Sequence, residues 1–232
     1  MVKNRNKVYA YCILDDNKFI VESNIVYTWD ECQNIVKGKK SRYKSFKTET
    51  EAKKWLECGA EYESKSEKQD KLIDLFAELD RDAIYFDAGT GRGKGVEVRL
   101  TNFDGIPILY KIIGNSKINE YGNYYLSEGS TNNFGELVGL FSAIKYALKY
   151  NIHTICGDSS LVIDYWSKGR YNKENLGKDT LKLIEKVTIM RKGFENKNGI
   201  IKKISGDVNP ADLGFHKWYK LYKLEEKWKN YY

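Results

Sequence analysis

The chain has 232 residues, with 39 Lys and Arg against 32 Asp and Glu, and a formal net charge of +7. This length allows one large domain or two smaller ones, and the mild positive charge suits a polyanionic partner without proving one. Its 18 Tyr and 5 Trp, interleaved with basic residues, suit nucleic acid. A general bias toward Lys, Asn, Tyr and Ile would give the same composition.

The four Cys are scattered without any Cys-x-x-Cys, and there are only two His, so the sequence argues against a structural zinc site. We expect reduced thiols and a cytoplasmic protein. The first residues are not followed by the apolar core of a signal peptide, and no run is apolar enough to span a membrane. We therefore expect no membrane partner, and nothing in the sequence indicates more than a monomer.

Residues 1–59 follow the pattern of a small α+β module. Alternating apolar residues predict strands at 8–14 and 19–26. Thr28 begins a short helix that Gly38 ends, and Thr48 begins a second helix over 49–57. With a basic and aromatic strand over 39–46 between the helices, the order is ββαβα.

Rings and cations gather between these two helices. Trp29 and Tyr43 suit stacking on sugars or bases, and the neighbouring cations suit phosphates. The alternative is that the rings form the core of a small domain, an interpretation that we prefer for Phe46. The cations concerned are Lys39, Lys40, Arg42 and Lys44.

The segments 8–10, 27–38 and 42–46 together resemble the hybrid-binding domain at the N-terminus of type-1 ribonucleases H, also called the caulimovirus viroplasmin domain. The resemblance covers residues 7–58. It implies that Tyr9, Trp29 and the aromatic–lysine pair Tyr43 and Lys44 grip an RNA/DNA duplex, with double-stranded RNA as a further ligand. Ser45 stands where the family has a second lysine.

Residues 60–81 are strongly charged and read as a linker, with helical spacing of apolar residues from 72 to 79. The second domain then spans 82–232. It opens with an apolar strand at 83–86 that ends at Asp87, followed by a Gly-rich stretch. This stretch is not a P-loop, because Gly93-Lys94 is followed by Gly95 instead of Ser or Thr. We interpret it as a hairpin that lets backbone approach a ligand.

Further strands are predicted at 96–100 and 106–113, while no motif explains 114–130. Thr131-Asn132-Asn133 opens a helix to Tyr150 with Glu136 in its first turn. The simplest interpretation is that Asn132 or Asn133 caps the helix and Glu136 complements its dipole. A strand at 152–157 ends at Asp158, where Ser159 or Ser160 caps the next helix.

The remaining elements are a helix at 178–192, a strand at 200–204 and a C-terminal helix opened by Asn209-Pro210, with Asp212 in its first turn. Four carboxylates thus stand at strand ends or helix starts. Carboxylate oxygens are ligands that Mg²⁺ prefers, and four can hold two ions about 4 Å apart across a scissile phosphate. One such carboxylate is usually a cap, but four in this order favour a metal site.

Residues 82–217 resemble the catalytic domain of type-1 ribonuclease H. The resemblance rests on Asp87 after a strand, Thr131-Asn132-Asn133 with Glu136, Asp158-Ser159, and Asp212 within Asn-Pro-Ala-Asp. It implies a ribonuclease H-like mixed five-stranded sheet flanked by helices. It also implies an endonuclease that cuts the RNA strand of RNA/DNA hybrids with two Mg²⁺, for which Mn²⁺ can substitute. The metal ligands would be Asp87, Glu136, Asp158 and Asp212, and the groups that read RNA 2′-hydroxyls would be Gly89, Asn132, Asn133 and Gly135.

Two departures from the family matter. The loop before the final carboxylate, residues 203–207, lacks the family's histidine. Asp207 or His216 could take its place, or no residue does. For Asp207 we prefer a plain turn role, and for His216 a surface or packing role. The family's basic protrusion is also missing, so the N-terminal module would supply the grip. The rival interpretations are a non-catalytic binder of hybrid or double-stranded RNA, and a DNA-processing nuclease of the same fold.

Overall fold

A computed structural model describes residues 7–90 and 95–213. The chain divides into two compact units, residues 1–68 and 69–232, which we call the N-terminal and C-terminal units. The division falls inside helix α3 (Lys65–Ala77), within the charged segment 60–81. The predicted limits 1–59, 60–81 and 82–232 stay predictions.

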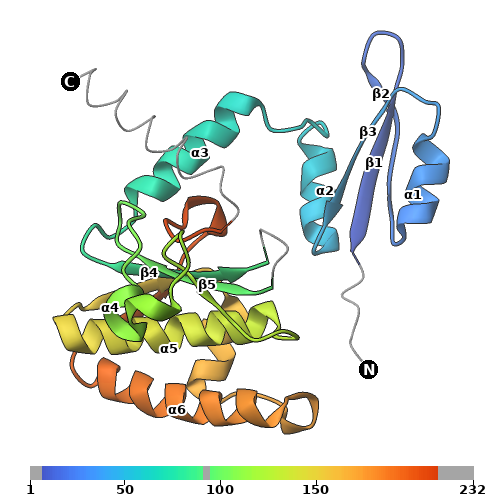
Figure 1. Ribbon diagram of the computed structural model, residues 1–232. Helices are drawn as coiled ribbons and strands as arrows, with labels where there is room; N and C mark the ends of the chain where they lie inside the picture. The colour runs from blue at the N-terminus through green and yellow to red at the C-terminus, as the bar shows by residue number, and fades with distance from the viewer. Residues whose placement is uncertain (1–6, 91–94, 214–232) are drawn as a thin grey trace, which may run out of the picture. The chain divides into compact units, whose positions relative to one another are not determined.

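The N-terminal unit has the predicted ββαβα order. Its sheet runs β2 (Ile20–Val26), β1 (Val8–Leu14) and β3 (Ser41–Phe46), all antiparallel. One face packs on α1 (Trp29–Val36) and the other on α2 (Glu49–Glu57) (Figure 1). Local signals explain the match, since Thr48 and Glu51 form a complete capping box at the start of α2.

The C-terminal unit holds a mixed sheet in the order β6-β5-β4-β7-β8. Strands β5 (Glu97–Thr101) and β6 (Tyr124–Tyr125) run antiparallel to their neighbours, whereas β4 (Ile84–Gly89), β7 (Thr154–Gly157) and β8 (Ile200–Lys203) are parallel. Helices α5 (Asn132–Tyr150) and α6 (Lys178–Glu195) stack below one face (Figure 1), and Phe76 of α3 packs on the other. The predicted fold class, a small α+β module before a mixed five-stranded sheet flanked by helices, is confirmed.

The predicted strand at 106–113 is wrong. Ile108 donates its N–H to Leu100 O, but the chain then turns into the short helix α4 (Tyr110–Ile113). This turn buries Leu109 completely and leaves Tyr110 exposed, so burial of one large side chain overrides the strand-like pattern. The third strand of the sheet is instead β6, whose two residues pair with Glu97 and Val98.

The segment 114–130, which no motif explained, is held by a buried polar cluster. The Glu97 carboxylate accepts hydrogen bonds from Asn123 Nδ2 at 2.8 Å and from Asn119 Nδ2 at 3.2 Å. Glu97 and Asn123 are almost fully buried. Because a buried carboxylate needs such partners, these contacts fix the loop that carries β6.

One helix also differs from prediction. The chain after Asp158 forms a π-helical turn (Leu161–Tyr165) and a 3₁₀ turn (Trp166–Lys168) instead of a regular helix. The buried Arg191 of α6 stabilises them, donating to Ile163 O and to Ser167 Oγ, each at 2.6 Å. The predicted helix after Asn209 lies mostly outside the described residues. Within the described ranges, no helix is both long enough and apolar enough to cross a membrane.

Candidate functional site

Close packing of α5 on the sheet brings Glu136 to strand β4. A Cβ at Gly135 would lie 2.6 Å from Val96 Cγ1 and 2.8 Å from Ala88 Cβ, so only glycine lets the helix approach this closely. One residue later, Glu136 Oε1 accepts a hydrogen bond from Ala88 N at 3.3 Å. Gly135, predicted to offer its backbone to RNA, is buried here and serves this packing.

Parallel pairing of β4 and β7 places Asp87 and Asp158 at the same edge. Tyr85 pairs with Cys156, and both carboxylates come two residues later. Asp158 directly follows its strand, as predicted, whereas Asp87 lies inside β4, which continues to Gly89. The two strands therefore present one carboxylate each at one point of the sheet.

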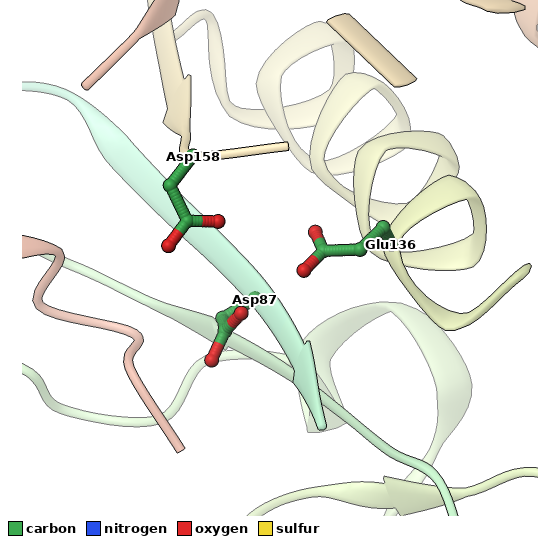
Figure 2. Close-up of side chains that lie close together, drawn as sticks. All are labelled: Asp87, Glu136 and Asp158. Carbon is green, nitrogen blue, oxygen red and sulfur yellow. The ribbon is translucent and has the colours of Figure 1, made fainter. Parts of the chain in front are cut away.

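Three predicted metal ligands meet in one cluster. One oxygen each of Asp87, Glu136 and Asp158 lies within 4.8 Å of the others. Figure 2 shows the three side chains pointing toward one another from strand β4, from the residue after β7 and from helix α5. Asp212 lies outside this group, but its charge still raises the pKa of Asp158 and of Asp87. Metal binding by the four carboxylates stays a prediction.

Burial and mutual repulsion dominate the electrostatics of the cluster. Burial, and then the charge of Asp158, raise the pKa of Asp87 to about 7. Burial, and then the charges of Asp87 and Asp158, raise the pKa of Glu136 to about 10. Burial and then the Asp212 charge raise the pKa of Asp158. These carboxylates resist ionisation together, which is the arrangement that a bound cation would relieve.

The hydrogen bonds of the cluster orient it without neutralising it. Leu213 N donates to Asp87 Oδ2 at 2.7 Å, and Asn209 Nδ2 donates to Phe86 O at 3.0 Å. A side-chain hydrogen bond from Asn209 also lowers the pKa of Asp158 against the stronger raising effects. Glu136 Oε2 is buried without a hydrogen-bond partner. A hard divalent cation fits this donor set, because it would supply the missing partner of that oxygen.

Two positioning residues were missed or only partly seen in the sequence. A Cβ at Gly206 would lie 2.6 Å from Asp158 Oδ2, so the loop before Asp212 passes tightly over this carboxylate. Asn209 was predicted only as a helix cap, and its Oδ1 does accept from Ala211 N, but its amide also reaches Phe86 O. In the sequence, Gly206 is a glycine in an ordinary turn, and such a residue does not indicate a role beside a carboxylate.

The start of α5 differs from the predicted cap. Thr131, not Asn132 or Asn133, caps the helix by accepting from Phe134 N, and Glu136 therefore lies in the second turn. Both asparagine side chains are exposed in the first turn, where a ligand can reach them. Their predicted contacts with RNA stay predictions, as do those of Gly89, the half-buried last residue of β4.

Of the two candidates for the missing loop histidine, Asp207 lies in the described part of the chain and is not a member of the three-carboxylate cluster. Asp207 is exposed in a 3₁₀ turn (Gly206–Val208), and its N–H donates to Ser205 Oγ. His216 lies outside the described residues. Neither prediction about these two residues is tested.

In the N-terminal unit, Tyr9, Trp29 and Tyr43 form an open group of rings that we call the ring cluster. The Trp29 ring lies 5.8 Å from Tyr9 and 5.5 Å from Tyr43, measured between centroids. Trp29 is 39% exposed and Tyr43 40% exposed, which leaves ring surface for stacking. Phe46, in contrast, packs against Trp55 in the core, as predicted.

Lys44 does not share a face with the ring cluster. Tyr43 pairs with Tyr11, and Lys44 pairs with Ala10, so their side chains point to opposite sides of the sheet. The Lys44 ammonium instead lies 5.6 Å from the Phe46 ring centroid. The Tyr43 and Lys44 side chains therefore lie on opposite faces of the sheet, and their predicted contacts with a duplex stay predictions.

Tyr62 braces the ring cluster, although the sequence placed it in the linker. Its hydroxyl accepts from Tyr43 N and donates to Tyr43 O, both at 2.9 Å. This one side chain satisfies the backbone N–H and C=O of Tyr43, which lie on the unpaired edge of β3. A tyrosine among charged residues gives no signal of such a role.

Residues 22–56 match the family model of the ribonuclease H1 N-terminal domain. The predicted resemblance of the N-terminal module is thereby confirmed over residues 22–56. No curated protein is significantly similar to the chain in sequence. Among solved structures, it is similar to the N-terminal RNase H domain of Rv2228c from Mycobacterium tuberculosis, determined as a fusion with maltose-binding protein. The identity is 19%, with 53% of this chain and 78% of that chain covered and a TM-score of 0.31. A likeness at that TM-score carries no information about activity.

Proposed function

We propose that the protein is a metal-dependent endonuclease that hydrolyses the RNA strand of RNA/DNA hybrids, leaving 3′-hydroxyl and 5′-phosphate ends. The observation that carries the proposal is the cluster of Asp87, Glu136 and Asp158, buried enough to resist ionisation and holding an unpartnered oxygen. It occurs in a chain that also contains a ribonuclease H1 N-terminal domain. Together these features favour nucleic-acid hydrolysis over binding alone.

Asp87, Glu136 and Asp158 would hold Mg²⁺, with Asp212 at their flank, and Mn²⁺ would substitute. Two bound ions would supply an activated water and stabilise the leaving oxygen of the scissile phosphate. The protein keeps the ligands in place: Leu213 N fixes Asp87, and the Asn209 amide and Gly206 border Asp158. This prearrangement lowers the cost of assembling the site, because the carboxylates need not move to bind.

Substrate recognition would divide between the two units. Asn132 and Asn133 are exposed in the first turn of α5, four and three residues before Glu136, so their amides can meet 2′-hydroxyls beside the scissile bond. The ring cluster would stack on the same duplex and raise affinity. We propose that the protein acts as a cytoplasmic monomer, with the N-terminal unit also accepting double-stranded RNA.

A substrate panel tests the proposal. Purified protein is incubated with end-labelled RNA/DNA hybrid, double-stranded RNA and a four-way DNA junction, each with Mg²⁺ and with EDTA. We expect cleavage of the hybrid's RNA strand alone, with ends that polynucleotide ligase can join to a 5′-phosphate. Cleavage of the junction would assign the protein to DNA processing. Tight hybrid binding without cleavage would leave it a binding protein.

A further inference from the structure

A groove in the C-terminal unit lies at the opposite end of α5 from Glu136. It has a volume of about 510 Å³ and is formed by α4, α5 and α6. Its lining residues are Lys111, Ile112, Lys145, Leu148, Lys149 and Met190. Lys145 follows Glu136 by nine residues, which is about 13 Å along a helix axis, so the groove is separate from the carboxylate cluster.

The charge around this groove has one sign. The three segments that form it, 108–118, 137–151 and 186–193, contain no Asp or Glu. Within the described ranges, Lys111, Lys145 and Lys149 form no ion pair, whereas Lys40, Lys53 and Arg191, for example, do. The groove therefore offers uncompensated positive charge to a partner.

Contacts with rings hold two of these lysines in place. Lys149 Nζ donates to Lys111 O at 3.2 Å, and the Nζ atoms of Lys111 and Lys149 lie 5.7 Å and 5.1 Å from the Tyr150 ring centroid. Tyr150 in turn packs on Tyr146, with ring centroids 4.5 Å apart. The ammonium groups are thus positioned before any partner arrives, which reduces the entropy lost on binding.

The floor of the groove is aliphatic. Ile112 and Met190 are half-buried against the core, and Leu148 is 40% exposed on α5. Aliphatic side chains rimmed by lysines complement a bulky apolar side chain flanked by carboxylates. Single-stranded nucleic acid fits less well, because none of the six lining residues offers a ring for base stacking, and the exposed rings of Tyr110 and Tyr150 are not part of the lining.

We propose that this groove binds a short acidic segment of a partner protein, with a Leu or Phe side chain on the aliphatic floor and carboxylates on the three lysines. The proposal does not depend on the nuclease activity proposed above. It assigns α4, α5 and α6 a recruitment role at a surface remote from the carboxylate cluster.

The probe is a fluorescein-labelled peptide in which aspartates flank a central Leu-Phe pair, followed by fluorescence anisotropy with the full chain. We expect saturable binding that weakens about tenfold or more when the aspartates become asparagine or the Leu-Phe pair becomes Ser-Ser. The triple variant Lys111→Ala, Lys145→Ala, Lys149→Ala and the single variant Leu148→Ser should each lose a similar factor. Circular dichroism and thermal unfolding verify that both variants fold.

Matched controls come from residues outside the three segments that form the groove. The triple variant Lys173→Ala, Lys178→Ala, Lys182→Ala removes the same charge, and Ile200→Ser removes a side chain that is 50% exposed and does not line the groove. Both should bind the peptide as the unaltered protein does. Equal losses in the control and groove variants would overturn the proposal, as would absence of binding up to about 1 mM peptide. An oligo(dT) probe that depends on the groove lysines while the peptide does not would assign the groove to nucleic acid instead.

Discussion

The ring cluster of the N-terminal unit and the carboxylate cluster of the C-terminal unit are built in opposite ways. Trp29 and Tyr43 leave about two-fifths of their surface exposed, at the margin of the small core against which Tyr9 packs. Asp87 and Glu136 are 7% and 8% exposed and lie against the main core of their unit. Exposed rings cost little stability, whereas buried carboxylates repel one another and destabilise the fold that holds them.

This difference teaches which kind of change each region tolerates. The ring cluster can lose a side chain and remain folded, so its variants should change binding alone. The carboxylate cluster stores unfavourable charge, so its variants should change both chemistry and stability, and in opposite directions. The predictions below test this contrast.

The largest effect is expected at Asp158. Asp158→Asn keeps the shape but removes a charge from the cluster, so RNA-strand cleavage should fall by at least about 10³-fold. Hybrid affinity, measured by anisotropy, should stay within about twofold, because the ring cluster is untouched. Retention of full cleavage by this variant would remove Asp158 from the site.

The next effect comes from Gly206. In Gly206→Ala the new Cβ would meet Asp158 Oδ2 at 2.6 Å, and the flexible carboxylate would yield instead of the backbone. A displacement of this kind should lower kcat by about 10²-fold and leave KM nearly unchanged. Gly193→Ala is the control, since a Cβ there meets nothing within 4 Å. Equal rates for both variants would show that the position of Asp158 is unimportant.

Stability of the metal-free protein should depend on pH through Asp87. Its pKa is raised from 3.8 to about 7 on folding, so it favours the folded state fully below pH 4 and loses this contribution as pH rises through 7. The loss is about 4 kcal/mol in the free energy of unfolding.

Urea unfolding from pH 4 to pH 8 measures this loss. Asp87→Asn should make the profile less steep, with the remaining slope coming from Glu136 and Asp158, whose pKa values are also raised, and the exposed control Asp82→Asn should leave it unchanged. An unchanged profile in Asp87→Asn would contradict the electrostatic account of the cluster.

The ring cluster should respond more modestly. Trp29→Ala should weaken hybrid binding about tenfold, which is the scale of one lost stacking contact, with little change in melting temperature. Tyr27→Ala is a matched control, because Tyr27 is 55% exposed and its hydroxyl bonds Glu49 outside the ring cluster. If both variants bind hybrid equally well, the ring cluster is not the binding surface.

The smallest effect is expected at Lys44. Because register places its ammonium on the face opposite Tyr43, Lys44→Ala should change hybrid affinity by less than about twofold at physiological salt. A loss as large as that of Trp29→Ala would mean that the duplex reaches both faces of the sheet.

Much of the fold followed from local signals in the sequence. The bounds of α2 follow from Thr48 and Glu51, and those of β1 from its alternation of residues. The local pattern of residues 106–113 fits a strand, but no strand forms there. Residues distant in the sequence decide that Leu109 is buried and that β6 pairs with β5. Propensity is a weak guide wherever tertiary packing selects between two conformations.

The site divides in the same way. Residue type and order singled out Asp87, Glu136 and Asp158, because a carboxylate at a strand end or helix start can be recognised from the sequence alone. The sequence did not reveal the residues that orient them. Leu213 N donates to Asp87 from 126 residues further along the chain, and Gly206 matters because a side chain there would collide with the Asp158 carboxylate. The prediction that Tyr43 and Lys44 both contact a duplex did not consider that neighbouring strand residues point to opposite faces, and these contacts stay a prediction.

The most direct test of the central claim is a metal titration of cleavage. Labelled RNA/DNA hybrid is incubated with the purified protein at increasing Mg²⁺, in parallel with Mn²⁺ and with EDTA. The account predicts that cutting is confined to the RNA strand, rises with either ion and disappears in EDTA. RNA-strand cleavage that persists in EDTA, or intact hybrid at every metal concentration despite tight binding, would contradict it.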